Sequence, residues 1–268
     1  MTSSLFSTST TSASLVVGAT GATGKHVVQL LLDQGQKVKV IARSKERMLT
    51  LLKSEDYGDR LTIMEASVLD LSDEELSEQI HDCQAVISCL GHNVDFHGIF
   101  GHPRRLVTDA TKRLTKVIID HNKDSTVNPK TKYILMGTVA VPHPDGTDDI
   151  RSVGERMILF LLRYLIPPHA DNEDATAYLY HSVAREDLEW SIVRPTDLIN
   201  GDEVSPYTIF EKPQDPLFGG TGVATRINVA HFMVELALDN KTWNQHKFKL
   251  PVLHDKPTTS KDESNKNK

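Results

Sequence analysis

The sequence predicts one α/β domain built on a doubly wound parallel sheet, with helices on both faces and a small irregular C-terminal region. A strand, a glycine-rich turn and a helix follow one another over residues 14–33. Apolar runs of β-type residues then alternate with amphipathic segments. With 39% hydrophobic residues, a chain of 268 residues can bury one sizeable core. We expect this domain at residues 14–254, between a flexible arm at 1–13 and a disordered tail at 255–268.

The turn between the first strand and the first helix is the strongest local signal. An apolar strand enters Gly18-Ala-Thr-Gly21-Ala-Thr-Gly24, and apolar residues then recur at helical spacing. A side chain at Gly18 or Gly21 would hinder the turn and block a diphosphate, and Gly24 would let helix and strand pack closely. The helix start adds unpaired N–H groups and a positive dipole end. We therefore expect a dinucleotide to contact Gly18, Thr20, Gly21, Ala22, Thr23 and Gly24.

The context of this turn supports the prediction more than its spacing does. The pattern is G-x-x-G-x-x-G, whereas many dinucleotide sites have G-x-G-x-x-G. A second apolar strand at 37–42 follows at the distance that a βαβ unit needs. The alternative is a turn that serves packing alone, but such a turn rarely needs three glycines in this register.

The end of the second strand indicates which dinucleotide is preferred. A site for NAD usually has a carboxylate there for the ribose hydroxyls, whereas a site for NADP has a cation and a hydroxyl for the 2'-phosphate. Arg43 and Ser44 stand at this point. The alternative is a solvated basic helix start, with Lys45 and Arg47 facing water. We expect NADP(H) to be preferred over NAD(H).

The rest of the chain continues the alternation. Strands are expected at residues 61–66, 84–90, 132–136, 189–194 and 247–250, and helices at 72–80, 104–120, 151–166, 172–187 and 228–238. Ser72 and Glu75 form a capping box, Pro195 stops a strand, and Asn228 is the expected N-cap of the last helix. Residues 196–226, rich in Pro and Gly, are expected to form a lid or substrate pocket.

Several candidate residues fall at the carboxyl ends of strands, where ligands of parallel sheets bind. Asp70 either bonds the adenine amine or serves local turn chemistry. Gly91 would let the backbone lie against the cofactor's ribose and diphosphate. His92 either reaches toward the nicotinamide or is an ordinary loop histidine. Leu90, Thr138 and Pro195 complete the expected cofactor contacts.

Composition and charge exclude other classes of function. A net charge of −6 and a pI near 6.0, without a basic face, argue against a nucleic-acid partner. The longest apolar stretch, 157–166, is about half of a membrane span and contains Arg163, so we expect no span. It predicts either a buried helix or a face for a partner, a homodimer or another protein. Cys83 and Cys89 match no metal or disulfide pattern, which predicts a reducing, cytoplasmic location.

Together these motifs resemble the short-chain dehydrogenase/reductase superfamily, specifically its atypical branch of NAD(P)H-binding, NmrA-like and biliverdin reductase B-like proteins. The resemblance covers residues 15–250 and depends on the segments 17–24, 42–44, 86–91 and 190–195. It implies a Rossmann-type sheet with a bound nicotinamide cofactor and a small-molecule substrate.

The chain departs from this superfamily at its catalytic motif. Better-studied members use Tyr-x-x-x-Lys, in which the lysine lowers the pKa of the phenol so that tyrosine exchanges a proton. No lysine occurs between Lys132 and Lys212, so the couple is missing there. Thr138 stands where the catalytic serine is usual, and Tyr180 and His181 lie on the helix that normally carries the tyrosine. These three are candidate catalytic residues, although Tyr180 and His181 are also suited to packing or surface roles.

Two functions remain open. The first is an NADPH-dependent oxidoreductase that transfers hydride to a small organic acceptor, with the cofactor's geometry supplying most of the chemistry. The second is a non-catalytic, NmrA-like protein that senses dinucleotide and changes partner affinity, which the missing couple favours. An epimerase ranks last, because such enzymes resemble members that keep the tyrosine and lysine.

Overall fold

The computed structural model describes residues 12–54, 57–92, 101–124, 130–148, 152–216 and 220–256. The predicted arm and tail lie almost wholly outside these ranges. The strands are β1 (Ala13–Val17), β2 (Lys37–Ala42), β3 (Leu61–Glu65), β4 (Cys83–Ser88), β5 (Lys132–Met136), β6 (Trp190–Pro195), β7 (Asp197–Ile199), β8 (Tyr207–Phe210), β9 (Val223–Thr225) and β10 (Val252–Asp255).

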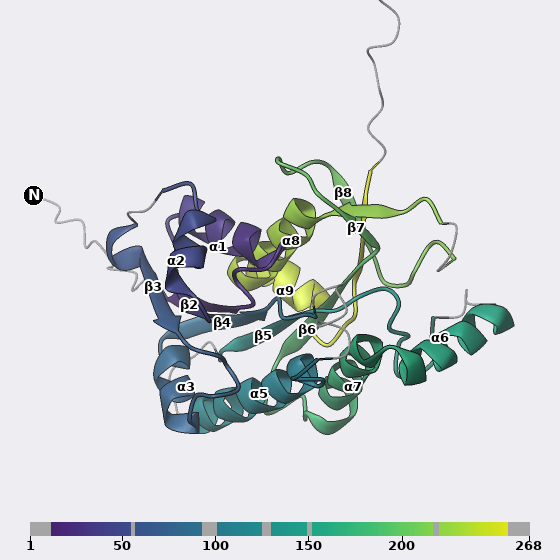
Figure 1. Cartoon of the computed structure of the whole chain (residues 1–268), viewed down its shortest axis with the longest axis horizontal. Coiled ribbons are helices and arrows are strands. Elements are labelled where there is room, and N and C mark those ends of the chain that lie inside the picture. The colour runs from purple at the N-terminus through teal and green to yellow at the C-terminus, as the bar shows by residue number, and fades with distance from the viewer. Residues whose placement is uncertain are drawn as a thin grey trace, which may run out of the picture.

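Eight of these strands form one sheet in the order β3-β2-β1-β4-β5-β6-β10-β8 (Figure 1). Neighbours pair in parallel except β10 with β8, which is antiparallel. Strands β7 and β9 form a separate parallel pair. The strand order reverses between β1 and β4, and ligands of such sheets bind at the carboxyl ends of the strands at this point.

Helices cover both faces of the sheet. They are α1 (Gly24–Asp33), α2 (Lys45–Thr50), α3 (Asp73–Ile80), α5 (Leu106–Asp124), α6 (Val153–Leu165), α7 (Pro167–Ser182), α8 (Arg226–Leu238) and α9 (Asn240–His246), with a 3-10 turn at Gly58–Arg60. Helix α1 packs along α8 on one face, and α5 packs between α3 and α7 on the other (Figure 1).

Each face of the sheet has its own apolar core. Leu31 of α1 and Phe232 of α8 belong to one core, and Leu114 of α5 and Leu179 of α7 belong to the other. Strand β1 is buried along its whole length, as expected for a parallel strand with helices on both sides. The prediction of a doubly wound α/β sheet is confirmed.

The C-terminal end of the sheet differs from the prediction. The last strand is β10, not residues 247–250, because 247–249 form the turn after α9. Phe248 has φ +60°, and the Lys249 N–H donates back to the His246 carbonyl (3.3 Å), so this segment turns rather than extends. Helix α9, whose first turn the Asp239 carboxylate caps, is absent from the predicted elements.

Asn228 is not an N-cap. Helix α8 begins at Arg226 after Thr225, and Asn228 is buried in its first turn. The Asn228 amide nitrogen donates to Ser205 Oγ (2.9 Å) and Asp255 Oδ1 (2.8 Å), and its oxygen accepts from the Ser205 N–H (2.9 Å). The side chain thus joins α8 to two segments that are distant in sequence.

Helix α6 projects from the body of the molecule (Figure 1). Its apolar side chains are largely exposed: Met157 is 62% exposed, Phe160 60% and Tyr164 70%. The prediction of a buried helix at 157–166 is therefore wrong. The alternative, a face for a homodimer or for another protein, stays a prediction.

Helix α7 begins five residues before the predicted helix at 172–187. Pro167 and Pro168 occupy its first turn, where a missing N–H costs little and the fixed φ of proline suits the helix. Asp171 consequently lies inside α7, although it falls outside the predicted helix. Its side chain is thereby placed in the interior, and Asp171 is one of the most buried charged residues in the described chain.

Candidate functional site

Two glycines of the turn after β1 are required by the fold itself. Gly18 has φ +73°, and a Cβ there would lie 2.5 Å from the backbone carbon and oxygen of Cys89, beyond β4. A Cβ on Gly24 would clash with the Gly18 oxygen. Gly21 differs, since its Cβ would meet only the Gly18 oxygen closely, at 3.1 Å. Packing therefore explains Gly18 and Gly24, whereas the contact at Gly21 is less severe, and a ligand over the turn there stays a prediction.

The start of α1 fits the phosphates of a dinucleotide. Thr23, at the N-cap position, makes no side-chain capping hydrogen bond, and the first turn contains no acidic residue. Gly21 and Ala22 are exposed on the outside of the turn, and Thr20 is partly exposed beside them. The N–H groups of Lys25 and His26 donate to the carbonyls of Gly21 (3.2 Å) and Thr23 (3.0 Å), so an anion here would be attracted mainly by the positive end of the helix dipole. The residues present therefore fit the cofactor that the turn predicts.

The side chains at the end of β2 are already partly engaged. Arg43 is exposed, whereas Ser44 caps α2 and accepts from the Arg47 N–H at 3.1 Å. Glu65, at the end of β3, accepts from the Lys45 N–H at 3.3 Å. Sequence reasoning missed Glu65, because its place beside Ala42 follows from strand pairing. A cation, Arg43, and a carboxylate, Glu65, thus lie near the end of β2, and contact of either with the ribose 2'-hydroxyl or its phosphate stays a prediction.

Asp70 is exposed in the turn after β3. The Ser67 hydroxyl accepts from the Leu69 N–H at 3.3 Å, and Arg113 of α5 donates to the Leu69 carbonyl at 2.6 Å. Contact between Asp70 and an adenine stays a prediction.

The end of β4 lies directly against the glycine turn. The N–H of Cys89 donates to the Val17 carbonyl at 2.9 Å, which extends the pairing of β4 with β1. Leu90 packs against the core on the α5 face. Gly91 is exposed, and a Cβ there would meet nothing within 4 Å. This open backbone is suited to the close approach of a ribose or diphosphate.

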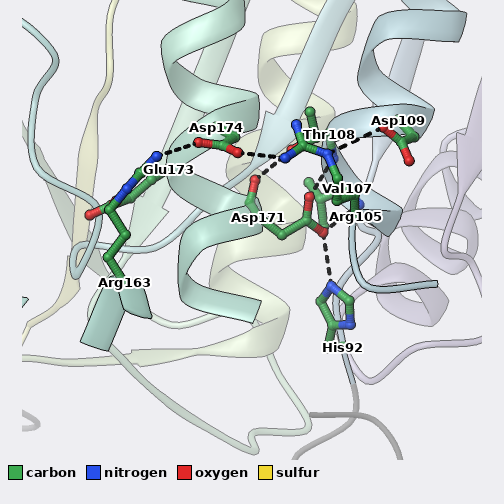
Figure 2. Close-up of polar contacts among 9 residues, drawn as sticks. All are labelled: His92, Arg105, Val107, Thr108, Asp109, Arg163, Asp171, Glu173 and Asp174. Carbon is green, nitrogen blue, oxygen red and sulfur yellow. Dashed lines mark hydrogen bonds and ion pairs between the residues drawn. The ribbon is translucent and has the colours of Figure 1, made fainter. Parts of the chain in front are cut away.

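The His92 side chain is only 6% exposed and is held by a buried carboxylate, and its reach toward a nicotinamide stays a prediction. Its Nε2 lies 2.8 Å from Oδ2 of Asp171 on α7. The same carboxylate accepts from the N–H groups of Val107 (2.8 Å) and Thr108 (2.9 Å), at the start of α5 (Figure 2). Burial pushes the pKa of Asp171 up, but these hydrogen bonds outweigh it and hold the pKa below its ordinary value.

Thr138 and Pro195 meet at the ends of β5 and β6. The N–H of Val139 donates to the Pro195 carbonyl at 3.0 Å, and the Thr138 hydroxyl accepts from the Ala140 N–H at 3.2 Å. Thr138 lines a pocket together with residues from the end of β6, the predicted lid and β10; these include Thr196, Asp197, Asp215, Gly222 and His254. Sequence reasoning missed His254, which lies outside every predicted element.

A buried ion pair holds the loop that follows Thr138. Arg194 of β6 is fully buried and donates to Asp148 Oδ2 at 2.6 Å, with the Asp148 side chain 3% exposed. Arg194 also donates to the carbonyls of Leu250 (3.0 Å) and Val141 (3.3 Å). These contacts hold residues 141–148 against β6 and the start of β10.

Tyr180 and His181 are not brought into the pocket of Thr138. The Tyr180 hydroxyl donates to Asp145 Oδ2 at 3.1 Å, and its ring contacts those of His143 and Trp190. Burial raises the pKa of Tyr180, and the Asp145 carboxylate raises it further. Tyr180 lines a second pocket that shares no residue with the first, and His181 is exposed. Their catalytic roles stay predictions.

The strand order, the glycine turn and the open strand ends define a Rossmann-type α/β fold. The profile of one family, described as NAD(P)H-binding, matches residues 18–240. The chain therefore belongs to the NAD(P)H-binding family. No curated protein matches its sequence.

Solved structures show the same fold at low sequence identity. An oxidoreductase from Lactococcus lactis shares 18% identity, with 91% of each chain covered and a TM-score of 0.62. A short-chain dehydrogenase/reductase from Veillonella parvula, in complex with NADP, shares 17% over 92% of this chain and 95% of that one, with a TM-score of 0.60. An anaerobillin reductase from Escherichia coli O157:H7 shares 17% over 91% and 98%, with a TM-score of 0.61.

Two further classes of site find no support in the described ranges. None of their helices is long and apolar enough to cross a membrane. No group of three or more His, Cys, Asp or Glu side chains there is arranged to hold a metal ion. Cys83 and Cys89 are unbridged and buried, and burial raises the pKa of each thiol to about 12.

Proposed function

We propose that this chain is an NADPH-dependent oxidoreductase that transfers hydride to a small organic acceptor without a Tyr-x-x-x-Lys couple. The observation that carries the proposal is the convergence of the glycine turn, Gly91 and the Thr138 pocket at one edge of the sheet. The anaerobillin reductase and the NADP complex share this fold, which supports a redox role. A cytoplasmic location is proposed with it, supported by the two unbridged, buried cysteines.

The chain's own residues would bind and orient the reactants. When bound, the nicotinamide supplies the hydride, which is the cofactor's chemistry. The start of α1 would hold the diphosphate, and Gly91 would admit the ribose. The Thr138 hydroxyl is available as a hydrogen-bond donor to an acceptor's oxygen in the adjoining pocket. Thr196, Asp197 and Asp215 of the predicted lid line the other side of that pocket and would keep water from it.

Turnover is the test of this proposal. Purified protein is expected to oxidise NADPH steadily with at least one of FMN, menadione and benzaldehyde, followed at the absorbance of NADPH. Calorimetry on the same sample measures binding. Tight NADPH binding with no oxidation by any flavin, quinone or aldehyde would instead favour the non-catalytic sensor.

The preference for NADP(H) leads to a second prediction. Arg43→Ala should weaken NADPH binding about tenfold, equivalent to about 1.4 kcal/mol, and leave NADH binding unchanged, because only the 2'-phosphate loses a partner. Calorimetry with both cofactors measures this. Arg47→Ala, on the short helix α2 that follows Arg43, is the matched control and should change neither affinity. Equal losses for NADPH and NADH in Arg43→Ala would contradict the preference.

An NmrA-like dinucleotide sensor is the second candidate. It is favoured by the missing couple and by Tyr180, whose hydroxyl is engaged by Asp145 in a pocket separate from that of Thr138. A sensor would bind cofactor with the same turn and strand ends. Its defining behaviour is a cofactor-dependent change in the affinity for a protein partner.

A further inference from the structure

The pocket beside Thr138 is acidic, a property that the contacts proposed above do not use. Asp197, at the start of β7, and Asp215, in the loop after β8, both line this pocket. Among the described residues that line it, none is a lysine or an arginine. In that set, two carboxylates therefore face the space for the acceptor without a side chain of fixed positive charge.

The basic residues near these carboxylates in the sequence do not line the pocket. Arg194 is buried and paired with Asp148. Arg226 approaches β7 but donates to Asn200 Oδ1 at 2.9 Å, and Lys212 lines a different pocket. No ion pair joins a lysine or an arginine to either carboxylate within the ranges that the structure describes. The negative charge of the pocket is therefore not compensated by these residues.

His254 of β10 faces Asp215 without neutralising it. Its Nδ1 lies 3.7 Å from Asp215 Oδ2. Burial lowers the pKa of His254 and outweighs the carboxylates of Asp215 and Asp255, which raise it. The ring is therefore uncharged at neutral pH, and the Asp215 carboxylate keeps its full negative charge.

The same ring leaves a polar atom without a partner. His254 is only 9% exposed and lines the pocket, and its Nε2 makes no hydrogen bond within the described chain. A ring nitrogen that is buried in this way costs free energy unless a hydrogen-bond partner is supplied. This atom is a second indication, independent of the acidic residues, that the pocket is built to receive a polar molecule.

Two glycines make room for the Asp215 side chain. A Cβ on Gly220 would lie 2.7 Å from Asp215 Cβ. A Cβ on Gly222 would lie 2.5 Å from Asp215 Oδ2 and 2.5 Å from His254 Cε1. A side chain at position 222 would therefore have to move both the carboxylate and the ring. The backbone thus packs closely around these two groups, which distinguishes Asp215 from an acidic residue on an open surface.

We propose that the Thr138 pocket selects the acceptor by charge: it binds a carbonyl compound that carries a cationic group, such as a quaternary amine, and excludes carboxylated and phosphorylated acceptors. Asp215 is the specificity-determining residue, and Asp197 adds to the negative potential. A carboxylate attracts the cation and repels the anion, so both effects increase the discrimination. This inference rests on the proposed oxidoreductase function.

Asp215→Asn tests this role, because the amide keeps the shape of the carboxylate and removes its charge. The probes, each with NADPH, are the cation 4-formyl-N,N,N-trimethylanilinium, neutral benzaldehyde and the anion 4-carboxybenzaldehyde. The ratio of kcat/KM for the cationic over the anionic aldehyde should fall about tenfold in the variant. Since the substituents also alter the reactivity of the carbonyl, this ratio is compared between proteins.

Asp202→Asn is the matched control, because Asp202 is an exposed aspartate of the predicted lid that does not line the Thr138 pocket. It should keep the wild-type ratio. Asp197→Asn should lower the ratio less than Asp215→Asn, because the Asp197 side chain is exposed to solvent, which screens its charge. A fall in Asp202→Asn as large as that in Asp215→Asn would mean that only net charge matters, and would overturn the proposal.

A readout without turnover comes from titrating the protein with benzyltrimethylammonium and with benzoate in the presence of NADP+, followed by NMR. The cation should bind more tightly than benzoate, with a Kd that rises about tenfold in Asp215→Asn. If the wild type reduces benzaldehyde, but folded Asp215→Asn keeps the wild-type ratio and benzoate binds as tightly as the cation, this inference alone fails. If the wild type oxidises no NADPH, the proposed function fails, and the titration still decides whether the pocket selects by charge.

Discussion

Replacing Gly21 by leucine is expected to raise the Kd for NADPH about 100-fold or more, a loss of about 2.7 kcal/mol. Gly21 is exposed on the outside of the turn, and a Cβ there meets only the Gly18 oxygen at 3.1 Å. The turn must therefore adjust only slightly, whereas a branched side chain would occupy the space that the diphosphate needs. Calorimetry gives the affinity, and thermal unfolding shows whether the variant is folded.

Gly154→Leu is the matched control for this substitution. Gly154 lies in the first turn of α6, where a Cβ would meet only Ser152 Oγ, at 3.9 Å. The same change of side chain should leave NADPH binding unaltered there. A folded Gly21→Leu protein that binds NADPH as tightly as the wild type would show that the turn serves packing alone.

Breaking the ion pair of Arg194 with Asp148 should destabilise the folded protein strongly. Arg194→Met leaves the Asp148 carboxylate buried without its cation and removes the hydrogen bonds to Leu250 and Val141. A loss of about 3–5 kcal/mol in the free energy of unfolding is expected, measured by urea denaturation.

The control is a cation in an exposed pair. Lys53 lies 3.1 Å from Asp33 with its side chain 74% exposed, so Lys53→Met should cost at most about 1 kcal/mol. Adding Asp148→Leu to Arg194→Met should recover part of the loss, because no buried charge then remains unpaired. If Arg194→Met loses as little stability as Lys53→Met, the pair of Arg194 and Asp148 does not hold the loop after β5.

The sequence indicates those features of the fold that local pattern determines. Alternating apolar strands and amphipathic helices identify the sheet, and the glycine spacing identifies the turn at the start of α1. The capping box of Ser72 and Glu75 is confirmed with both hydrogen bonds present. Each of these signals lies within a few residues of chain, so no tertiary information is needed to read it.

Features that depend on distant partners could not be read in this way. Asparagine is a residue type favoured at N-caps, yet Asn228 lies inside the helix, where Ser205 and Asp255 form hydrogen bonds with its side chain. His92 is a lone histidine in the sequence. It contacts Asp171 only in the fold, and no residue near either of them in the sequence indicates this contact. Residues 247–250 have the apolar alternation of a strand, but most of them form the turn that follows α9. The strand forms later in the chain, as β10.

The contact between Gly18 and the backbone of Cys89 has a consequence for how the cofactor associates. Because no side chain separates the two segments, the β1–α1 turn and the end of β4 pack backbone against backbone, and this arrangement is established during folding. The conformational entropy of these two segments is therefore lost on folding, before any ligand binds. A larger part of the free energy of the ligand contacts then appears as binding affinity, because little rearrangement is needed when the ligand binds.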